Sequence, residues 1–271
     1  MAVARSSEGP RSAPVQRRFE GHRFMVTGAG TGFGAELAVR AAQEGAARVL
    51  VHYRASAAGA ERTAARVREA GAEPHLIQGD ITSWADIKRM AETAFGPFGG
   101  LDVLVNNVGD MASGQSSWTE VTEAAIDHVL AVDIKVTMLM VHEFGQRMAE
   151  RDGGSIVNVG STVIVRGSPR APQYAAGKYG LLGITKSYAK ALAPTVRVNT
   201  FAPGFMETEA LLNRPEWKAG RREAVLAGTP AGKIPKPEDM TGAALFLASD
   251  DAHHITGSYM VADGGYSMLG A

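Results

Sequence analysis

The sequence contains no cysteine, which excludes disulfide bonds, thiolate nucleophiles and cysteine-ligated zinc. It has no uninterrupted apolar run of 18 or more residues and no signal-peptide pattern, so we expect no transmembrane helix. Net charge is also absent, because 28 basic residues match 28 acidic ones, and nothing favours binding to nucleic acid or to an anionic membrane. These absences predict a cytoplasmic protein whose partner is a small molecule.

The chain does have enough apolar residues for a full core, with 45% hydrophobic content in 271 residues. The first twenty residues, MAVARSSEGPRSAPVQRRFE, are rich in Arg, Ser, Pro and Ala and show no apolar period. They predict a flexible arm over 1–20, with an organelle transit peptide as the alternative. A single ordered domain is then expected over 21–271, because the composition does not change again along the chain.

Short apolar runs alternate with amphipathic stretches from residue 21 onward. The runs are continuous, as expected for strands buried on both faces of a parallel sheet. The stretches between them, such as WADIKRMAETAF, repeat apolar residues every three or four positions, which is typical of helices. This order predicts a single doubly wound α/β domain, with a mostly parallel seven-stranded sheet and helices on both faces. The expected strands are 23–28, 48–53, 74–80, 101–107, 154–161, 196–203 and 257–265.

A glycine-rich segment, TGAGTGFG, ends the first expected strand at 27–34. Glycine allows a tight turn and a close approach of the backbone to a pyrophosphate, and the following helix offers free N–H groups and the positive end of its dipole. We therefore predict a dinucleotide site of the Rossmann type, with a ligand-free tight turn as the alternative. Its candidate residues are Gly28, Thr31, Gly32, Phe33 and Gly34.

The end of the second expected strand indicates which dinucleotide binds. An acidic residue there would hold the ribose 2′-hydroxyl of NAD, but no Asp or Glu occurs between Arg48 and Glu61. Tyr53 is instead followed by Arg54, whose guanidinium can pair with a 2′-phosphate. NADP(H) is therefore favoured over NAD(H), with a solvated loop arginine as the alternative interpretation of Arg54.

The segment PQYAAGKYG, residues 172–180, places Tyr174 four positions before Lys178. Residues four apart share one face of a helix, and by itself such a pair is usually only helix surface. A phenol, with a reference pKa near 10, becomes a general acid/base at neutral pH when nearby positive charge stabilises its phenolate. The pair is a candidate catalytic unit whose role depends on the rest of the site.

Five motifs together resemble the short-chain dehydrogenase/reductase family. They are the glycine segment, NNVG at 106–109, the serine of NVGS at 161, YAAGK at 174–178 and APGFMET at 202–208. The resemblance covers roughly residues 21–265, and within the family it is greatest to 3-oxoacyl-[acyl-carrier-protein] reductases and related carbonyl reductases. It implies a Rossmann domain, a homotetramer or homodimer, and reduction of ketones or oxidation of secondary alcohols with NAD(P).

The resemblance also implies roles for single residues. Tyr174 matches the general acid/base, Lys178 its partner that binds the nicotinamide ribose, and Ser161 the hydroxyl that stabilises charge on the substrate oxygen. A helix cap, a turn and a strand end are the structural alternatives for Asp80, Asn107 and Ser161, respectively. A substrate lid is expected over about 207–228. The further cofactor contacts implied are Asp80, Ile81, Asn107, Gly109, Pro203, Gly204 and Thr208.

The chain departs from the family pattern at Asp133, in VLAVDIK, where many relatives carry an asparagine that completes a proton path. Part of that role uses a backbone carbonyl, so Asp133 remains a candidate catalytic residue, and its carboxylate near Lys178 is expected to alter the pH profile. Three histidines, His52, His253 and His254, lack a paired carboxylate or a helical i, i+4 partner. They are interpreted as solvated or loop residues, and no metal site is predicted.

The sequence thus predicts an NADP(H)-dependent enzyme that reduces a ketone to a secondary alcohol, with a 3-oxoacyl thioester as one candidate substrate. An alcohol, sugar or steroid dehydrogenase working in the oxidative direction is the alternative. A dinucleotide-sensing protein without catalysis is the alternative of another class. The loop 110–118 and the lid are expected to shape the pocket, but neither contains a feature that identifies a particular ketone.

Overall fold

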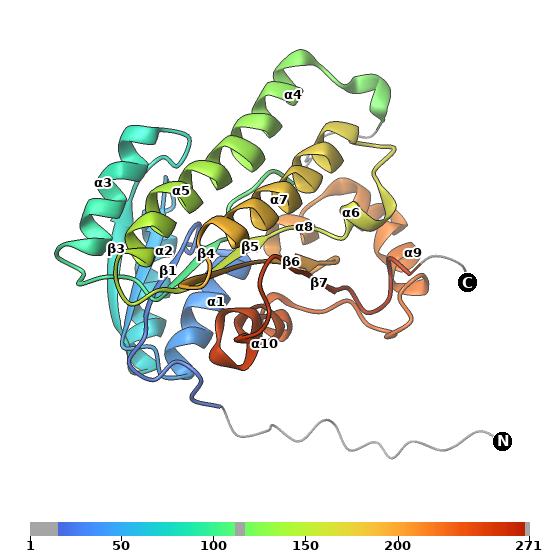
Figure 1. Ribbon diagram of the computed structural model, residues 1–271. Helices are drawn as coiled ribbons and strands as arrows, with labels where there is room; N and C mark the ends of the chain where they lie inside the picture. The colour runs from blue at the N-terminus through green and yellow to red at the C-terminus, as the bar shows by residue number, and fades with distance from the viewer. Residues whose placement is uncertain (1–15, 112–116, 269–271) are drawn as a thin grey trace.

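Seven parallel strands form the sheet at the centre of the molecule (Figure 1). The computed structural model describes residues 16–111 and 117–268. Within these residues the strand order is β3-β2-β1-β4-β5-β6-β7, and every neighbouring pair is parallel. The order changes direction between β1 and β4, as in a doubly wound sheet. The strands are β1 Arg23–Val26, β2 Arg48–Tyr53, β3 Glu73–Gln78, β4 Val103–Asn106, β5 Gly154–Val159, β6 Val196–Pro203 and β7 Tyr259–Ala262.

Helices cover both faces of this sheet (Figure 1). On one face α1 contacts α2 and α10, and on the other α5 contacts α3 and α7, which confirms the predicted fold class. The longer helices are α1 Gly32–Gln43, α2 Ala57–Glu69, α3 Trp84–Phe95, α5 Val136–Ala149, α7 Pro172–Ala191 and α10 Pro237–Ala248. The shorter ones are α4 Glu123–Val129, α6 Val163–Arg166, α8 Glu209–Leu212 and α9 Arg222–Ala227. Single turns of 3₁₀-helix occur at η1 Trp118–Glu120 and η4 Asp250–Ala252, and a π-helical turn at η2 Leu130–Lys135. The segment η3 Trp217–Arg221 contains a kink, because Ala219 and Gly220 have non-helical backbone angles.

The core lies in two layers, one on each face of the sheet. Successive strand side chains point to opposite faces because a strand has a side-chain period of two. In β1, Phe24 and Val26 belong to the layer that includes residues of α1 and α10, whereas Met25 belongs to the layer with residues of α3 and α5. Both faces of the central strands β1, β2, β4, β5 and β6 are buried, which explains why their sequences are continuous apolar runs. The edge strands β3 and β7 are more exposed.

The packed domain begins before the predicted boundary at residue 21. Phe19 is fully buried, and its ring meets the Phe24 ring edge-on with 4.7 Å between centroids. Arg18 Nε lies 2.6 Å from Glu44 Oε2, and the Glu44 side chain is itself buried. The predicted arm therefore ends before Arg18, because Arg18 and Phe19 are held by the core, and residues 1–15 of that prediction lie outside the described residues.

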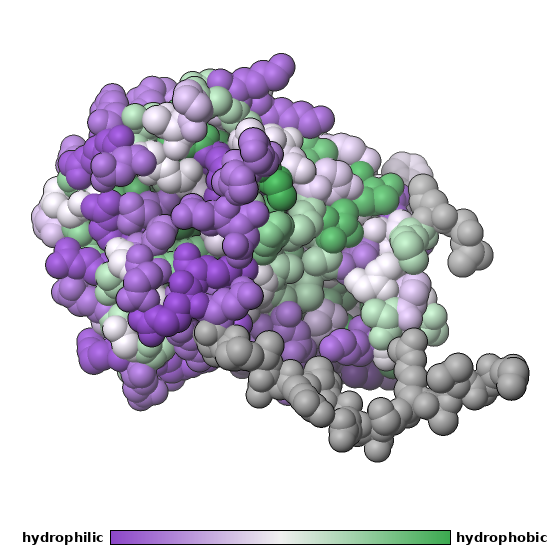
Figure 2. Space-filling model, turned by 60° about the horizontal axis from the view of Figure 1, so that its bottom comes forward, coloured by the Kyte–Doolittle hydropathy of each residue, from purple (hydrophilic) through white to green (hydrophobic). Residues whose placement is uncertain are grey.

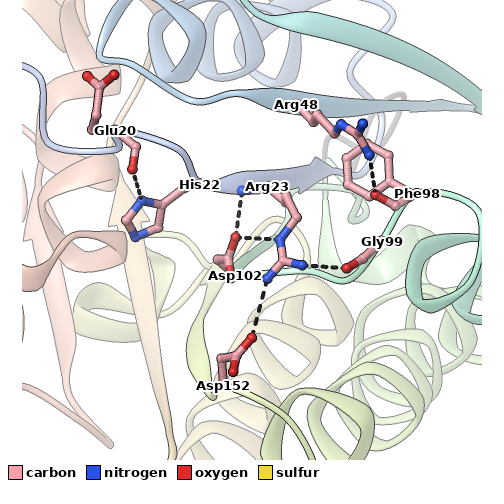
Figure 3. Close-up of polar contacts among 8 residues, drawn as sticks. All are labelled: Glu20, His22, Arg23, Arg48, Phe98, Gly99, Asp102 and Asp152. Atoms are coloured by element: carbon pink, nitrogen blue, oxygen red, sulfur yellow. Dashed lines mark hydrogen bonds and ion pairs between the residues drawn. The ribbon is translucent and has the colours of Figure 1, made fainter.

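Arginine side chains tie together the amino edge of the sheet (Figure 3). Arg23, the first residue of β1, donates from Nε to Asp102 Oδ2 at 2.9 Å and from Nη2 to Asp102 Oδ1 at 2.7 Å. Arg48, the first residue of β2, donates to Phe98 O at 3.0 Å. Burial acts to raise the pKa of the Asp102 carboxyl, but the hydrogen bonds and the charge of Arg23 outweigh it and keep this pKa lowered. Two strands are thereby fastened to the segment before β4, at the edge opposite the predicted site.

Apolar side chains remain exposed in several places on the surface. In the view of Figure 2 the left of the molecule is largely hydrophilic, and hydrophobic surface gathers towards the centre and right. Tyr259 and Val261 are exposed on β7, the last strand in the order, and Met138 on α5 and Tyr179 on α7 are exposed as well. Across the two described ranges, no helix has the length and apolarity needed to span a bilayer.

Candidate active site

The predicted site residues gather at the carboxyl edge of the sheet. Because all seven strands are parallel, the segments that follow them emerge on the same side. The glycine segment follows β1, Arg54 follows β2, Asp80 follows β3, Asn107 follows β4 and Ser161 follows β5. Ligands of open α/β sheets bind in this position, at the point where the strand order changes direction.

The glycine segment forms the turn between β1 and α1. Gly28 has a φ of +64°, in the left-handed region that favours glycine. A Cβ on Gly34 would lie 2.6 Å from both Asn107 Nδ2 and Gly28 O, so the close passage of backbone here requires glycine. Thr31 precedes α1, and its side chain does not cap the first N–H groups of the helix. A close-packed turn with uncapped N–H groups fits the pyrophosphate of a dinucleotide.

The other residues of the segment differ in what they can offer a ligand. Thr31 and Gly32 are exposed. Phe33 is buried in the core and stacks on Phe201 with 5.8 Å between ring centroids. Only the backbone of Phe33 is therefore available to a bound dinucleotide.

His52 is buried, at 1% exposure, and the interpretation of it as a solvated or loop histidine was wrong. Its Nδ1 accepts a hydrogen bond from the Gly28 N–H at 3.0 Å, and its Nε2 lies 3.0 Å from Gly79 O. Since Nδ1 accepts, Nε2 carries the proton and donates, which fixes the neutral tautomer. Burial lowers the pKa of His52, against the opposing effect of the Gly79 carbonyl. The His52 side chain therefore joins the glycine turn to the end of β3. In the sequence, the sign of this structural role is a polar residue inside the apolar run RVLVHY. His253 and His254 are exposed, as interpreted.

Arg54 and Asp80 lie beside a cleft of about 620 Å³ at the ends of β2 and β3. The Arg54 side chain is 70% exposed, and its Nη1 is 4.0 Å from Asp80 Oδ2. Asp80 Oδ1 accepts hydrogen bonds from Thr82 N at 2.9 Å and Thr82 Oγ1 at 2.7 Å, and these bonds lower the pKa of the Asp80 carboxyl. Ser83, rather than Asp80, caps α3. Tyr53 is half-buried at the end of β2, and Ile81 is buried beside Asp80.

Lys178 is a buried cation held by a buried carboxylate. Its Nζ lies 3.0 Å from Asp133 Oδ1, and the exposure of the two residues is 4% and 1%. The ammonium is also 5.6 Å from the centroid of the Tyr174 ring, one helical turn earlier in α7. Asp133 Oδ1 accepts a further hydrogen bond from Asp110 N at 2.9 Å. The structure thus brings together the phenol, the ammonium and the carboxylate that the sequence singled out.

Asp133 enters this site from a π-helical turn between α4 and α5. Such turns often accompany functional sites because the extra residue redirects a side chain. Burial raises the pKa of the Asp133 carboxyl, although Lys178 and the Asp110 N–H act in the opposite direction. A Cβ on Gly109 would collide with Lys178 Nζ and lie 2.8 Å from Asp133 Oδ1, so a side chain at Gly109 is not compatible with this ion pair.

A buried polar network lies beneath α7 and was not predicted from the sequence. Asn106 Nδ2 donates to Asn158 Oδ1 at 2.9 Å, and Asn158 Nδ2 donates to Thr185 Oγ1 at 3.0 Å. The Thr185 hydroxyl is also 2.8 Å from Thr200 Oγ1. The chain of bonds connects β4, β5, α7 and β6, and therefore fixes the helix that carries Tyr174 and Lys178 on the sheet.

Ser161 and Asn107 lie at the two strand ends next to this network. Ser161 is half-buried just after β5, where its Oγ accepts a hydrogen bond from Val163 N at 3.3 Å. The Asn107 backbone N–H donates to Thr27 Oγ1 at 2.9 Å, and its side-chain Nδ2 donates to Thr27 O at 2.9 Å. Asn107 therefore links the ends of β4 and β1.

The remaining expected cofactor contacts lie after β6. Pro203 ends the strand and is buried, and the Gly204 N–H donates to Ala262 O at 2.9 Å. The Thr208 hydroxyl accepts from Leu211 N at 3.2 Å and so caps α8. Beyond it, the segment expected as a lid folds over its own apolar cluster, in which Trp217 and Val225 are buried.

No group of three or more His, Cys, Asp or Glu that could hold a metal ion occurs in residues 16–111 and 117–268. The fold, together with the residues at the carboxyl edge of the sheet, defines a dinucleotide-binding α/β domain with a tyrosine and a lysine one helical turn apart. The family profile described as Enoyl-(Acyl carrier protein) reductase matches residues 28–267. The chain belongs to the short-chain dehydrogenase/reductase family, whose named members act as oxidoreductases on CH–OH and C=O groups.

Named relatives are similar along nearly the whole chain. A 3-oxoacyl-[acyl-carrier-protein] reductase of Thermotoga maritima is 36% identical over 252 residues, which is 92% of this chain and 98% of the relative. The cis-4-hydroxycyclohexanecarboxylate dehydrogenase of Sinomonas cyclohexanicum is 34% identical, over 90% of this chain and 96% of the relative. A solved structure from Agrobacterium tumefaciens, provisionally assigned as a 2-deoxy-D-gluconate 3-dehydrogenase with bound NADP, has a TM-score of 0.81 and 30% identity, and covers 93% of this chain and 98% of its own.

Proposed function

We propose that this protein is an NADP(H)-dependent reductase that converts a ketone to a secondary alcohol. The observation that carries the proposal is the buried Lys178–Asp133 pair, with Nζ and Oδ1 3.0 Å apart and the Lys178 ammonium 5.6 Å from the centroid of the Tyr174 ring. Buried ion pairs are costly to form, so a lysine held in this way beside a phenol favours a chemical role over helix surface.

The residues of the site divide the work of the reaction. A bound nicotinamide supplies the hydride that reaches the carbonyl carbon. Ser161 and Tyr174 donate hydrogen bonds to the carbonyl oxygen, and the Tyr174 hydroxyl gives up its proton as the alkoxide forms. Lys178 stabilises the resulting phenolate by its charge, and Asp133 positions the ammonium. The ketone thereby gains one hydride and one proton, and the reverse reaction uses the phenolate as the base.

The dinucleotide lies along the carboxyl edge in this proposal. Gly28, Gly32 and Gly34 and the first N–H groups of α1 bind the pyrophosphate, together with Thr31 and the Phe33 backbone. Asp80 and Ile81 flank the adenine, and Asn107, Gly109, Lys178, Pro203, Gly204 and Thr208 surround the nicotinamide ribose and carboxamide. Arg54 is exposed just after β2, and no Asp or Glu occurs between Arg48 and Glu61, so its guanidinium favours the 2′-phosphate of NADP. The NADP in the Agrobacterium neighbour supports the same choice.

The substrate and the direction of the reaction are not the same in all relatives. One is named for reducing 3-oxoacyl thioesters and another for oxidising a hydroxycyclohexanecarboxylate. A 3-oxoacyl thioester therefore stays a candidate substrate, and the oxidative direction with an alcohol or a sugar is the second candidate function. The segment 207–228 is proposed as the lid over either substrate, because its helices pack on one another through Trp217 and Val225.

A homotetramer, or a homodimer, is proposed as the working form. Exposed apolar side chains on α5 and α7, Met138 and Tyr179, and on the edge strand β7, Tyr259 and Val261, supply two separate surfaces. Two surfaces on one chain allow two different two-fold contacts, which together build a tetramer.

The decisive experiment replaces Tyr174 by Phe and measures NADPH oxidation with acetoacetyl thioesters and simple ketones. Loss of the proton donor is expected to lower kcat/KM by about 10²- to 10⁴-fold, while dinucleotide binding measured by calorimetry is retained. Tyr179→Phe is the matched control, since Tyr179 is exposed on the same helix and is expected to keep full activity. Turnover that survives Tyr174→Phe would refute the mechanism, and dinucleotide binding without turnover of any carbonyl or alcohol by the wild-type protein would favour a sensor.

A further inference from the structure

His52 connects the two segments to which the proposed function assigns the dinucleotide. Its Nδ1 accepts a hydrogen bond from the Gly28 N–H of the glycine segment at 3.0 Å. On the other side of the ring, its Nε2 lies 3.0 Å from the carbonyl oxygen of Gly79, which directly precedes Asp80. One side chain therefore reaches from the segment proposed for the pyrophosphate to the segment proposed for the adenine.

The backbone of His52 also contacts the glycine segment. The Ala29 N–H donates to His52 O at 2.8 Å, so the end of β2 bonds two successive residues of the turn. On its other side the turn meets the segment after β4. A Cβ on Gly28 would lie 2.8 Å from Val108 Cγ2 and 3.4 Å from Asn107 Nδ2. The glycine segment is thus held between the ends of β2 and β4, and the His52 imidazole contributes a side-chain bond on the β2 side.

The imidazole ring acts on a ligand only through the backbone that it holds, because His52 is 1% exposed. The Gly28 N–H is occupied by this ring, and Gly28 has a φ of +64° at the start of the turn. The residues proposed to bind the pyrophosphate, Gly32 and Gly34, follow it. A change at the Gly28 N–H would therefore alter where these residues and the first N–H groups of α1 point.

Charged groups act on His52 from the end of β3 and from α3, whereas the glycine segment TGAGTGFG has no titratable side chain. Burial lowers the pKa of His52, and the Asp80 carboxylate acts in the opposite direction. Arg54 Nη1 lies 4.0 Å from Asp80 Oδ2. From α3, Asp86 Oδ2 accepts from Asp80 N at 2.7 Å, and Arg89 donates to the last carbonyl of β3 at 2.8 Å. The net effect favours the neutral ring, in which Nδ1 is an acceptor.

We propose that neutral His52 is a positioning residue of the dinucleotide site, which holds the glycine segment in the conformation that binds the pyrophosphate, and that uptake of a proton at Nδ1 weakens dinucleotide binding. The inference rests on the dinucleotide site of the proposed function. Both nitrogens of a protonated imidazole donate, so Nδ1 would face the Gly28 N–H donor to donor. The bond to Gly28 is then lost, and the turn is no longer held at that point. Affinity for the dinucleotide thereby responds to pH through a residue that the dinucleotide does not touch.

The first test replaces His52 by Gln, which keeps a donor for Gly79 O but removes the acceptor for the Gly28 N–H. At pH 8 the Kd for NADP⁺, measured by calorimetry, is expected to rise about tenfold, because a buried donor loses its partner. KM for NADPH and for NADH should rise by the same factor, since both cofactors contain the pyrophosphate, and kcat at saturating cofactor should stay within about twofold. His254→Gln is the control, because His254 is exposed. Thermal melts check that both variants are folded at the assay temperature.

The second test follows the Kd for NADP⁺ from pH 8 to pH 5 in the wild type and in His52→Gln. The ratio of the two constants is compared, because the 2′-phosphate of the ligand also titrates, near pH 6, and its contribution cancels in the ratio. Since the folded pKa of His52 is lowered, the advantage of the wild type is fully present above about pH 6.5 and is lost as the pH falls towards the folded pKa. The ratio is expected to shrink at least about threefold by pH 5.

The direction of this change decides between positioning and simple electrostatics. The negative charge of a bound pyrophosphate would by itself favour a protonated His52, and the advantage of the wild type over His52→Gln would then grow as the pH falls. A growing or constant ratio would overturn the proposal. So would a His52→Gln variant that binds NADP⁺ at pH 8 as tightly as the wild type, or one that loses kcat with KM unchanged.

Measuring binding and turnover separately keeps this inference distinct from the proposed function. If NADP⁺ binds with the expected pH response but no ketone or alcohol is converted, the proposed reductase fails and the role of His52 stands. If ketones are reduced but the ratio of dissociation constants does not change with pH, the proposed function stands and the role of His52 is refuted. A wild-type protein that binds no dinucleotide would refute both.

Discussion

The Lys178 ammonium and the Asp133 carboxylate are in direct contact, with Nζ 3.0 Å from Oδ1 and both side chains buried. A carboxylate at this distance offsets much of the charge through which Lys178 would stabilise a Tyr174 phenolate. Replacing Asp133 by Asn keeps the volume and an oxygen for the Asp110 N–H, but removes the negative charge. Lys178 then stabilises the phenolate more strongly, and the phenolate is the base in alcohol oxidation. The pH profile of kcat/KM for alcohol oxidation by Asp133→Asn is therefore expected to lie about one pH unit lower than that of the wild type.

Asp127→Asn is the control for that shift, since Asp127 is exposed on α4. The melting temperatures of both variants need to be compared with that of the wild type, because a buried lysine without its carboxylate also destabilises a protein. An Asp133→Asn enzyme with an unshifted profile would mean that Asp133 only anchors the lysine.

His52 makes stability depend on pH. Because burial lowers its folded pKa, the unfolded chain takes up a proton first as the pH falls below about 6.5. The contribution of the neutral histidine is thus fully present above that pH and is lost as the pH falls towards the folded pKa. The free energy of unfolding of the wild type minus that of His52→Asn, from urea titrations, is expected to decrease from pH 8 to pH 5.

At pH 8, His52→Asn is expected to lower the free energy of unfolding by about 1 to 3 kcal/mol, because buried hydrogen bonds to Gly28 and Gly79 are lost. His254→Asn serves as the control, since His254 is exposed and should show neither effect. A difference between wild type and His52→Asn that does not vary with pH would show that the folded histidine titrates like an unfolded one.

Arg54 provides the prediction for cofactor choice. Replacing this exposed arginine by Ala removes the partner of the 2′-phosphate, so KM for NADPH is expected to rise about tenfold or more. KM for NADH should change little, because NADH has no 2′-phosphate, and this makes the second cofactor an internal control. Equal changes for both cofactors would point to damage at the end of β2 rather than to recognition of phosphate.

Replacing Gly34 by Ala tests whether the start of α1 must pack closely against the glycine turn. An alanine Cβ there would lie 2.6 Å from Gly28 O and Asn107 Nδ2, so Gly34→Ala is expected to cost about 1 to 3 kcal/mol and to weaken dinucleotide binding. Gly183→Ala is the matched control, because nothing lies within 4 Å of its Cβ position in α7. It is expected to stabilise the helix by up to about 1 kcal/mol. Thermal melts and calorimetric titration with NADP⁺ measure both effects, and a harmless Gly34→Ala would contradict the packing argument.

The oligomer is tested by adding charge to the exposed apolar positions. Light scattering of the wild type is expected to give the mass of four chains, or of two. Tyr259→Glu on β7 and Tyr179→Glu on α7 should each reduce that mass by breaking one contact, and the double variant should give a monomer. A wild-type protein that is monomeric at micromolar concentration would refute the proposal.

The sequence was a good guide to the fold because hydrophobic period and glycine position are local signals. All seven strands and the order of helices follow from continuous apolar runs such as RVLVHY and from amphipathic stretches between them. The spacing of Tyr174 and Lys178 is likewise local, since both lie in one helix. The packed domain begins earlier than the predicted residue 21, because the burial of Phe19 depends on contacts with residues that are distant in the sequence.

The parts of the site that could not be predicted depend on tertiary contacts. His52 looks like any histidine in the sequence, and its role arises from Gly28 and Gly79 meeting it from two other segments. The hydrogen bonds from Asn106 to Asn158 and from Asn158 to Thr185 join residues that lie up to 79 positions apart in the sequence (185 − 106 = 79). A local sequence pattern does not reveal contacts over that separation.

The bonds that tie Arg23 to Asp102 and Arg48 to Phe98 lie at the amino edge of the sheet, and the residues proposed for chemistry lie at the carboxyl edge. Stability and reactivity are therefore supplied from opposite ends of the same strands. Loops on the reactive side can be lengthened, shortened or exchanged without loosening the fastened side. A scaffold with this division of labour can acquire a new substrate through a few loop substitutions while its folding remains the same.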